Sequence, residues 1–465
     1  MNMRLSLCLL FTCLFDTGCR TPIHGAVDLA IRDVTVLDGT GAVARSGRTV
    51  LVAGGRIAGI LAGSFEGHAE REIDGSGLFL IPGLIDAHTH PSPAGPIELS
   101  DEQLASVFEP MLRFGVTTAV IYGGSRGSYH SMEDLASRSQ EGSIDTPRLL
   151  YTSPITSIEG AHPVRTYTKN NWVEGETILI PRSLEDIDGI VAEAAARDAI
   201  GVKIIVEDGP QPPFIEPMPA SWVERFVQKG RELGVPIYAH VSDMNEVRTC
   251  VEAGVHALVH YWGVELDWAT DAAVIDRMVE RDISWVTTLV LGKGMIYYPL
   301  HPEWLERAEL RTNFDGDLLA SLGGRDEAAR ARPLLETWTG DPDLPMDEFF
   351  APDVAGIAQA YRRGINMVLG TDVGNHCVFP GFSLHEEMEI LQTGGMRPLE
   401  ILRMGTHNPA RMLGRSDDLG TLEVGKLADM LLLRSDPSED VANMRDIERV
   451  FISGQERYRR DSPGR

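Results

Sequence analysis

Residues 80–91 read LIPGLIDAHTHP, an apolar run that ends in two histidines one residue apart. In a β-strand, residues two positions apart point to the same side, so His88 and His90 share a face from which Thr89 points away. Two imidazoles on one face can converge on a single metal ion. The alternative is a strand end that carries two solvated or hydrogen-bonded histidines, and this stretch alone does not decide between them.

Further residues of metal-ligand type end later apolar segments. IYAH ends at His240, ALVH ends at His260 and LGTD ends at Asp372. A single histidine at a strand end is more often a hydrogen-bonded core residue than a ligand. A set of such residues at successive strand ends, however, indicates a metal site.

Lys203, in the apolar segment GVKIIVED, does not fit such a site as an ammonium group. An ammonium repels a metal cation, and a buried lysine needs a compensating partner. Reaction of its amine with carbon dioxide would give a carbamate, an anion that is able to bridge two metals. The alternative is a barrel lysine that pairs with Glu207 or Asp208.

The segments that carry these residues belong to an alternating strand and helix pattern beyond residue 80. Amphipathic helix patterns such as SLEDIDGIVAEAAARDA and SWVERFVQKGRELG separate apolar strand candidates. Besides the strand before His88, these candidates are 115–123, 148–153, 202–208, 236–241, 257–262, 283–291 and 366–372. Eight strands alternating with helices predict an α/β fold with a (β/α)8 TIM barrel, whose catalytic groups lie where the strands end.

Both ends of the folded chain show short alternating strands and tight turns instead. These patterns cover 27–80 and 416–458, and we expect them to form one small β-sandwich domain beside a barrel at 81–415. The longest connection within the barrel, 292–355, is predicted to be a lid. It could instead contact a neighbouring subunit of the homo-oligomer that we expect.

The first 19 residues have the layout of a secretory signal peptide. Arg4 precedes the apolar run 5–15, and Gly18-Cys19 resembles the end of a bacterial lipobox, although Asp16 stands where that motif usually has leucine. We therefore expect an exported protein, either periplasmic or anchored to the cell envelope through a lipid on Cys19. The net charge of -26 argues against nucleic acid and anionic membrane surfaces as partners and leaves a small molecule.

The set HTH, Lys203, His240, His260 and Asp372, in this order, resembles the binuclear centre of the amidohydrolase superfamily. The phrases LIPGLIDAHTH, GTDVG, SLHEEMEIL, THNPARMLG and LGTLEVGKLADMLLL resemble its imidazolonepropionase-like and prolidase-like (Xaa-Pro dipeptidase-like) branch. The resemblance extends from about residue 28 to 455.

This resemblance implies two divalent metal ions, with zinc as the expected metal. His88 and His90 would bind the buried ion, and His240 and His260 the more exposed one. Carboxylated Lys203 would bridge the two ions, and Asp372 would bind the first ion and contact a bridging hydroxide. Asp372 would then act first as base and later as acid towards the departing nitrogen.

The expected function is hydrolysis of a C–N amide bond in a small substrate by the metal-bridging hydroxide. Dipeptides, Xaa-Pro dipeptides among them, and N-acyl amino acids are the expected substrates. A cyclic-amide hydrolase or a deaminase is the nearest alternative, but deaminases of this superfamily usually have one metal and lack the bridging lysine. An esterase or lactonase remains open, and the complete ligand set argues against a catalytically inactive surface binding protein.

Three further residues are weaker candidates. His162, in IEGAHPVR after the third strand, could hydrogen-bond the developing oxyanion, with an ordinary loop histidine as the alternative. Arg165 could bind a substrate carboxylate through its planar guanidinium, or it could be solvated like most loop arginines. Tyr261 follows a ligand and could contact the substrate or only pack.

Overall fold

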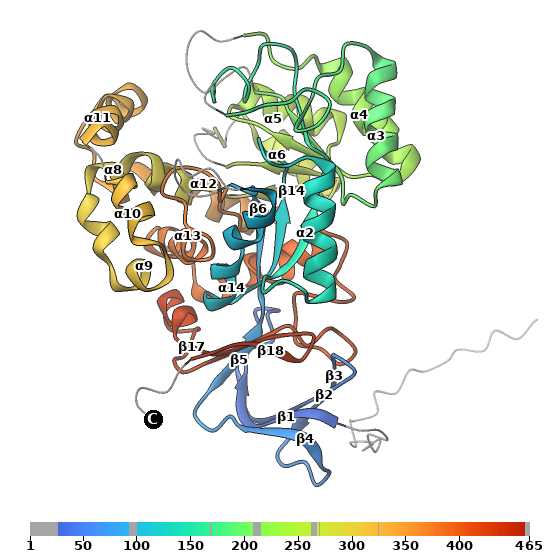
Figure 1. Ribbon diagram of the computed structural model, residues 1–465, viewed down its shortest axis with the longest axis vertical. Helices are drawn as coiled ribbons and strands as arrows, with labels where there is room; N and C mark the ends of the chain where they lie inside the picture. The colour runs from blue at the N-terminus through green and yellow to red at the C-terminus, as the bar shows by residue number, and fades with distance from the viewer. Residues whose placement is uncertain are drawn as a thin grey trace, which may run out of the picture.

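The structure is a computed structural model that describes residues 27–92, 100–167, 170–207, 215–261, 267–268, 270–323 and 325–460. The predicted signal peptide and Cys19 lie outside the described residues, so export and lipidation stay predictions. Within the described part of the chain, no helix combines the length and the apolar character needed to cross a membrane. Figure 1 shows a helix-rich body above a small group of strands.

Parallel strands occupy all eight of the predicted positions in the larger body. They are β6 (Leu84–Thr89), β7 (Val116–Ile121), β8 (Arg148–Tyr151), β11 (Val202–Ile205), β12 (Ile237–His240), β13 (Ala257–Val259), β14 (Ser284–Val286) and β15 (Asn366–Val368). β6 to β8 form one sheet, and β11 to β15 belong to a second. The Ser153 amide donates to the Gly201 carbonyl (2.9 Å) and the Ala87 amide to the Leu369 carbonyl (3.1 Å). Backbone hydrogen bonds therefore link the two sheets at both edges, as a barrel requires.

Helices follow most of these strands, and their ends carry the expected signals. The Ser183 hydroxyl accepts a hydrogen bond from the Asp186 amide at the start of α3, and left-handed Gly234 ends α4. The helices are α1 (Glu109–Arg113), α2 (Tyr129–Glu141), α3 (Leu184–Ala196), α4 (Ala220–Leu233), α5 (Met244–Ala253), α6 (Ala272–Glu280), α13 (Phe382–Thr393), α14 (Pro398–Met404) and α15 (His407–Met412).

Two details of the barrel differ from the prediction. The strand predicted at 283–291 ends at Val286, and a helical turn, α7 (Val290–Gly292), begins four residues later. The buried Glu387 carboxylate accepts a hydrogen bond from the Val290 amide (2.7 Å), so a contact distant in sequence outweighs the β-propensity of TTLVL. Two unpredicted two-residue strands, β9 (Ile155–Thr156) and β10 (Ile178–Leu179), extend the second sheet beyond β11.

The two chain ends form one sheet. Its strands are β1 (Val27–Val36), β2 (Arg45–Ala53), β3 (Arg56–Ala62), β4 (Ala69–Asp74), β5 (Phe79–Pro82), β16 (Met430–Leu433), β17 (Ile447–Ile452) and β18 (Gln455–Arg459). β5 pairs antiparallel with β16, which joins the N-terminal strands to the C-terminal ones. β1 pairs with β2, β4 and β5 along its length, so all eight strands belong to one hydrogen-bonded sheet, and the packing of this sheet as a sandwich stays a prediction.

The 292–355 connection is mostly helical and packs on the barrel. It comprises a π-helical turn (Lys293–Tyr297), α8 (Tyr298–Leu300), α9 (Ala308–Asn313), α10 (Gly316–Leu322), α11 (Arg325–Thr339) and the first half of α12 (Met346–Arg363). Buried Lys293 and buried Glu386 of α13 form an ion pair of 2.6 Å, and the Tyr298 hydroxyl donates to Glu386 (2.9 Å). These contacts hold the connection against the barrel, where α8 to α11 form a lobe at its side (Figure 1).

A buried ion pair joins the barrel to the small sheet. Arg148 of β8 pairs with Asp429, which also accepts a hydrogen bond from the Ser453 amide (2.7 Å). The two charged side chains are 13% and 5% exposed. Arg148→Ala would leave the Asp429 carboxylate buried without its counter-charge, so we expect the free energy of unfolding to fall by about 3 kcal/mol.

Urea denaturation would measure this loss, with Arg138→Ala as the control. Arg138 pairs with Asp134 at 3.0 Å on the surface of α2, and its loss should change stability by less than about 1 kcal/mol. Equal effects of the two substitutions would show that the Arg148–Asp429 pair does not hold the two parts together.

Candidate active site

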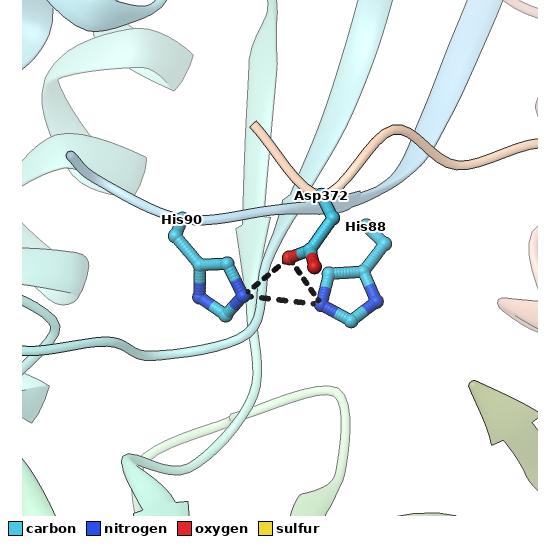
Figure 2. A group of neighbouring side chains, drawn as sticks. All are labelled: His88, His90 and Asp372. Carbon is cyan, nitrogen blue, oxygen red and sulfur yellow. Dashed lines mark hydrogen bonds and ion pairs between the residues drawn. The ribbon is translucent and has the colours of Figure 1, made fainter. Parts of the chain in front are cut away.

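Three of the predicted ligands meet at the end of β6. The Nε2 atoms of His88 and His90 lie 3.2 Å apart, and Asp372 Oδ1 lies 3.4 Å from the first and 2.9 Å from the second (Figure 2). Bonds of about 2.0–2.1 Å in a tetrahedral zinc site separate neighbouring ligand atoms by about 3.3 Å. The spacing therefore matches that of three ligands around one divalent ion.

Contacts behind the ligands orient them. His90 Nδ1 donates to the Gly123 carbonyl (2.8 Å), so its Nε2 keeps a lone pair that faces Asp372. The ring of His88 stacks on Tyr122, with ring centroids 4.5 Å apart. Each ring therefore has a fixed position.

Asp86 is a supporting residue whose role the sequence did not reveal. Its buried carboxylate accepts hydrogen bonds from the Thr371 hydroxyl (2.6 Å), the Thr371 amide (3.2 Å) and the His88 amide (3.3 Å). Asp86 thus ties the end of β6 to the segment that carries Asp372, whose backbone has a left-handed φ of 64°. Burial raises the pKa of Asp86 to about 7.

The other two predicted histidines lie beside this group. The rings of His240 and His260 have centroids 4.4 Å apart, and His260 Nδ1 is hydrogen-bonded to the Thr288 hydroxyl (2.8 Å). His240 Nε2 pairs with the buried carboxylate of Glu207. The structure therefore brings together all of the predicted histidine ligands, and it adds Glu207, which the sequence had suggested only as a partner for Lys203.

Lys203 is fully buried, and its Nζ has no hydrogen-bond partner among the described residues. The nitrogen lies 5.0 Å from the ring centre of Tyr122. Burial lowers the pKa of Lys203 to about 7, although Asp372 and Glu207 oppose this shift. Near neutral pH a large part of the side chain is therefore a neutral amine, the form that reacts with carbon dioxide. Asp208, the other suggested partner, lies outside the described residues.

Burial favours the neutral, metal-binding form of four histidines at the site. Burial lowers the pKa of His162 to about 4 and that of His240 to about 3. It also lowers the pKa values of His88 and His260 well below the usual value, and Lys203 contributes to both shifts. A neutral imidazole keeps one nitrogen lone pair, so each of these rings can offer a donor atom to a cation.

His162 lies in the site, but its hydrogen bonds limit its role. Its Nδ1 lies 2.6 Å from the Thr166 hydroxyl, which donates to the Pro163 carbonyl (3.2 Å) and so accepts from the ring. In the neutral ring, Nε2 then carries a lone pair and lies 4.0 Å from Glu207. A hydrogen bond from Nε2 to an oxyanion would need the protonated ring, which the low pKa disfavours, so the oxyanion role stays a prediction.

The site opens into a cavity of about 1470 Å³. The metal-ligand residues line it together with Tyr261, whereas half-buried Arg165 is not among the lining residues. Trp338, Leu344 and Phe349 line it from the 292–355 connection. That connection therefore forms part of the cavity wall, as a lid would.

Comparisons with known proteins point to one family. The model of the Amidohydrolase family matches residues 79–457. A 5-methylthioadenosine/S-adenosylhomocysteine deaminase of Symbiobacterium thermophilum is 24% identical over 458 residues, which cover 89% of this chain and 88% of that protein. An imidazolonepropionase of Caldanaerobacter subterraneus subsp. tengcongensis is 22% identical over 414 residues, or 78% of each chain.

A solved structure agrees with these sequence matches. The structure of a Xaa-Pro dipeptidase with bound methionine superposes with a TM-score of 0.70 at 20% identity, and the match covers 93% of this chain and 99% of that one. At this level of identity the similarity shows a shared fold and does not identify a substrate.

We expect His90→Ala to remove bound metal, because His90 Nε2 faces both other ligand atoms of the group at the end of β6. Elemental analysis of protein purified with added zinc should show a metal content lowered by at least about half. His301→Ala is the control, since His301 is half-buried outside the cluster, where it pairs with Glu303 and stacks on Trp304. Metal content that both substitutions leave unchanged would contradict a metal site at His90.

Proposed function

Because the chain belongs to the amidohydrolase family, we propose that it hydrolyses a C–N amide bond of a small substrate with two divalent metal ions. The family match and the cluster of donor residues support a metal-dependent hydrolase. The two-metal proposal rests on Lys203, whose buried amine lies beside that cluster and has no hydrogen-bond partner among the described residues. As a carbamate, this side chain would have the two metal ions as its partners. Dipeptides and N-acyl amino acids are the substrate types that the sequence favours.

The donor set fits two ions of the kind that nitrogen and oxygen ligands bind, such as zinc. His88, His90 and Asp372 would hold one ion, and His240 and His260 the other, with carboxylated Lys203 between them. When bound, the ions supply a water of lowered pKa and polarise the substrate carbonyl.

Asp372 is placed to move protons. Its Oδ1 faces the Nε2 atoms of His88 and His90, and its Oδ2 lies 4.0 Å from His260 Nδ1. We propose that its carboxylate accepts the proton of the attacking water and later donates it to the leaving nitrogen. Because an amide nitrogen leaves poorly without a proton, the second transfer matters most.

A deaminase is the second candidate, because the Symbiobacterium relative carries that name. Deamination also adds water at a carbon bonded to nitrogen, so the same donor set could serve it. Lys203 favours the two-metal hydrolase. Release of ammonia from 5′-methylthioadenosine, without cleavage of any amide in a broad panel, would decide for the deaminase.

Asp372→Asn should lower kcat for amide hydrolysis by about a hundredfold or more, since asparagine cannot carry the proton. Steady-state kinetics of the metal-loaded protein on a panel of amides, esters and lactones would measure this effect. Asp276→Asn, which breaks a surface pair with Arg363, is the control and should leave kcat unchanged. Normal amide turnover by Asp372→Asn would assign proton transfer to another group, and turnover of esters alone would indicate an esterase.

Lys203→Ala should lose most of the bound metal, because in this proposal the carboxylated Lys203 side chain is a ligand of both ions. Elemental analysis after purification with zinc and bicarbonate, together with circular dichroism to verify folding, would measure the loss. Lys229→Ala removes a lysine that pairs with Glu232 on α4 and should keep the full metal content. Retention of two ions per chain by folded Lys203→Ala would exclude the bridging role.

A further inference from the structure

The cavity that leads to the site has an acidic wall. Asp243, Glu348 and Asp353 line it in addition to the metal-ligand residues. Glu348 is exposed and the other two are half-buried, so all three lie closer to solvent than the buried ligands do. Among the described lining residues, Lys203 provides the only lysine or arginine side chain, and it is fully buried at the metal-ligand group.

Local structure fixes these carboxylates near the cavity. Asp243 caps α5 and accepts hydrogen bonds from the amides of Asn245 (2.7 Å) and Glu246 (2.9 Å), which hold its side chain in place. Glu348 and Asp353 both belong to α12. Burial and the nearby charge of Asp353 both raise the pKa of the Tyr261 hydroxyl, which also belongs to the cavity lining.

Aromatic side chains complete the wall. Trp268, Trp338 and Phe349 line the cavity and are half-buried, so each still has surface that a ligand could cover. Such surfaces bind flat apolar groups, and the faces of aromatic rings also attract cations. For a carboxylate, the described wall offers no lysine or arginine other than the buried Lys203, and its ring faces repel anions.

We propose that the site selects uncharged or cationic amides that carry an aromatic or bulky apolar group, and that it discriminates against substrates with a free carboxylate. This inference rests on the proposed function and narrows it, because free dipeptides and N-acyl amino acids carry a carboxylate. The physical cause is like-charge repulsion by Asp243, Glu348 and Asp353 in a partly desolvated cavity. Arg165, which the sequence suggested as a carboxylate partner, does not line this cavity.

Binding of three matched ligands would test the inference independently of turnover. 3-Phenylpropylamine (as the ammonium), 3-phenylpropanol and 3-phenylpropanoate share a phenyl group and differ in charge. Calorimetry on the metal-loaded protein should give Kd values that rise in that order, with the carboxylate about tenfold weaker than the ammonium. Added salt should reduce this ratio, because part of the wall is exposed to solvent.

Substitutions in α12 would locate the source of the selectivity. Glu348→Gln and Asp353→Asn should each reduce the ammonium-to-carboxylate ratio by about threefold, as expected for removal of one partly screened charge. Asp347→Asn, which removes a charge from the same turn of α12 but not from the cavity lining, should leave the ratio unchanged. A carboxylate ligand that binds as tightly as the ammonium, or a ratio that these variants do not change, would overturn the inference.

Turnover separates this inference from the proposed function. N-acetylphenethylamine should be hydrolysed with a kcat/KM about tenfold higher than that of N-acetylphenylalanine, which differs from it by one carboxylate. The opposite preference would overturn the charge selectivity and leave the amide hydrolase intact. If neither amide is cleaved, the broad amide panel decides the proposed function, and the ligand-binding ratios still decide the charge selectivity.

Discussion

Burial of a lysine amine among five imidazoles is the constraint on which the rest of this structure depends. Loss of water lowers the pKa values of Lys203 and of His88, His162, His240 and His260, so these nitrogens keep lone pairs at neutral pH. The Nε2 atoms of His88 and His90 lie 3.2 Å apart, close enough for both to reach one cation. If this cluster binds metal as proposed, metal binding should contribute to folding.

The barrel supports this cluster through contacts between residues that are far apart in the chain. The buried Asp86–Thr371 hydrogen bonds join β6 to the segment after β15, and Gly123 after β7 orients His90. His260 and Asp372 both adopt a left-handed backbone, with φ values of 73° and 64°. Such conformations persist when surrounding contacts determine them, which is what the hydrogen bonds around these residues supply.

Chemistry and selectivity come from different parts of the chain. The predicted ligands lie in or shortly after strands of the barrel, whereas the cavity wall comes largely from connections such as α12 and the segment before it. A deaminase, an imidazolonepropionase and a Xaa-Pro dipeptidase all resemble this chain over most of its length. Fold and ligand set alone therefore do not name a substrate, and the charge of the wall is the more informative feature.

The sequence by itself determined the residue types of the site and the order of the strands that carry them. The two-residue period of LIDAHTH places His88 and His90 on one face, and local hydrophobic patterns place His240 at the end of a strand and His260 and Asp372 shortly after strands. Helices α3 and α4 follow from the same kind of local signal. Such patterns depend only on residues that are neighbours in the sequence, so the helices and strands were largely predictable.

Only the tertiary structure decided which of these groups touch. The Glu207–His240 pair, the Asp86–Thr371 hydrogen bonds and the end of β14 at Val286 depend on partners tens to hundreds of residues away. Burial decided the low pKa of Lys203, since desolvation is a property of the folded surroundings and not of GVKIIVED. The acidic wall likewise exists only because α5 and α12, about a hundred residues apart in the chain, meet at one cavity.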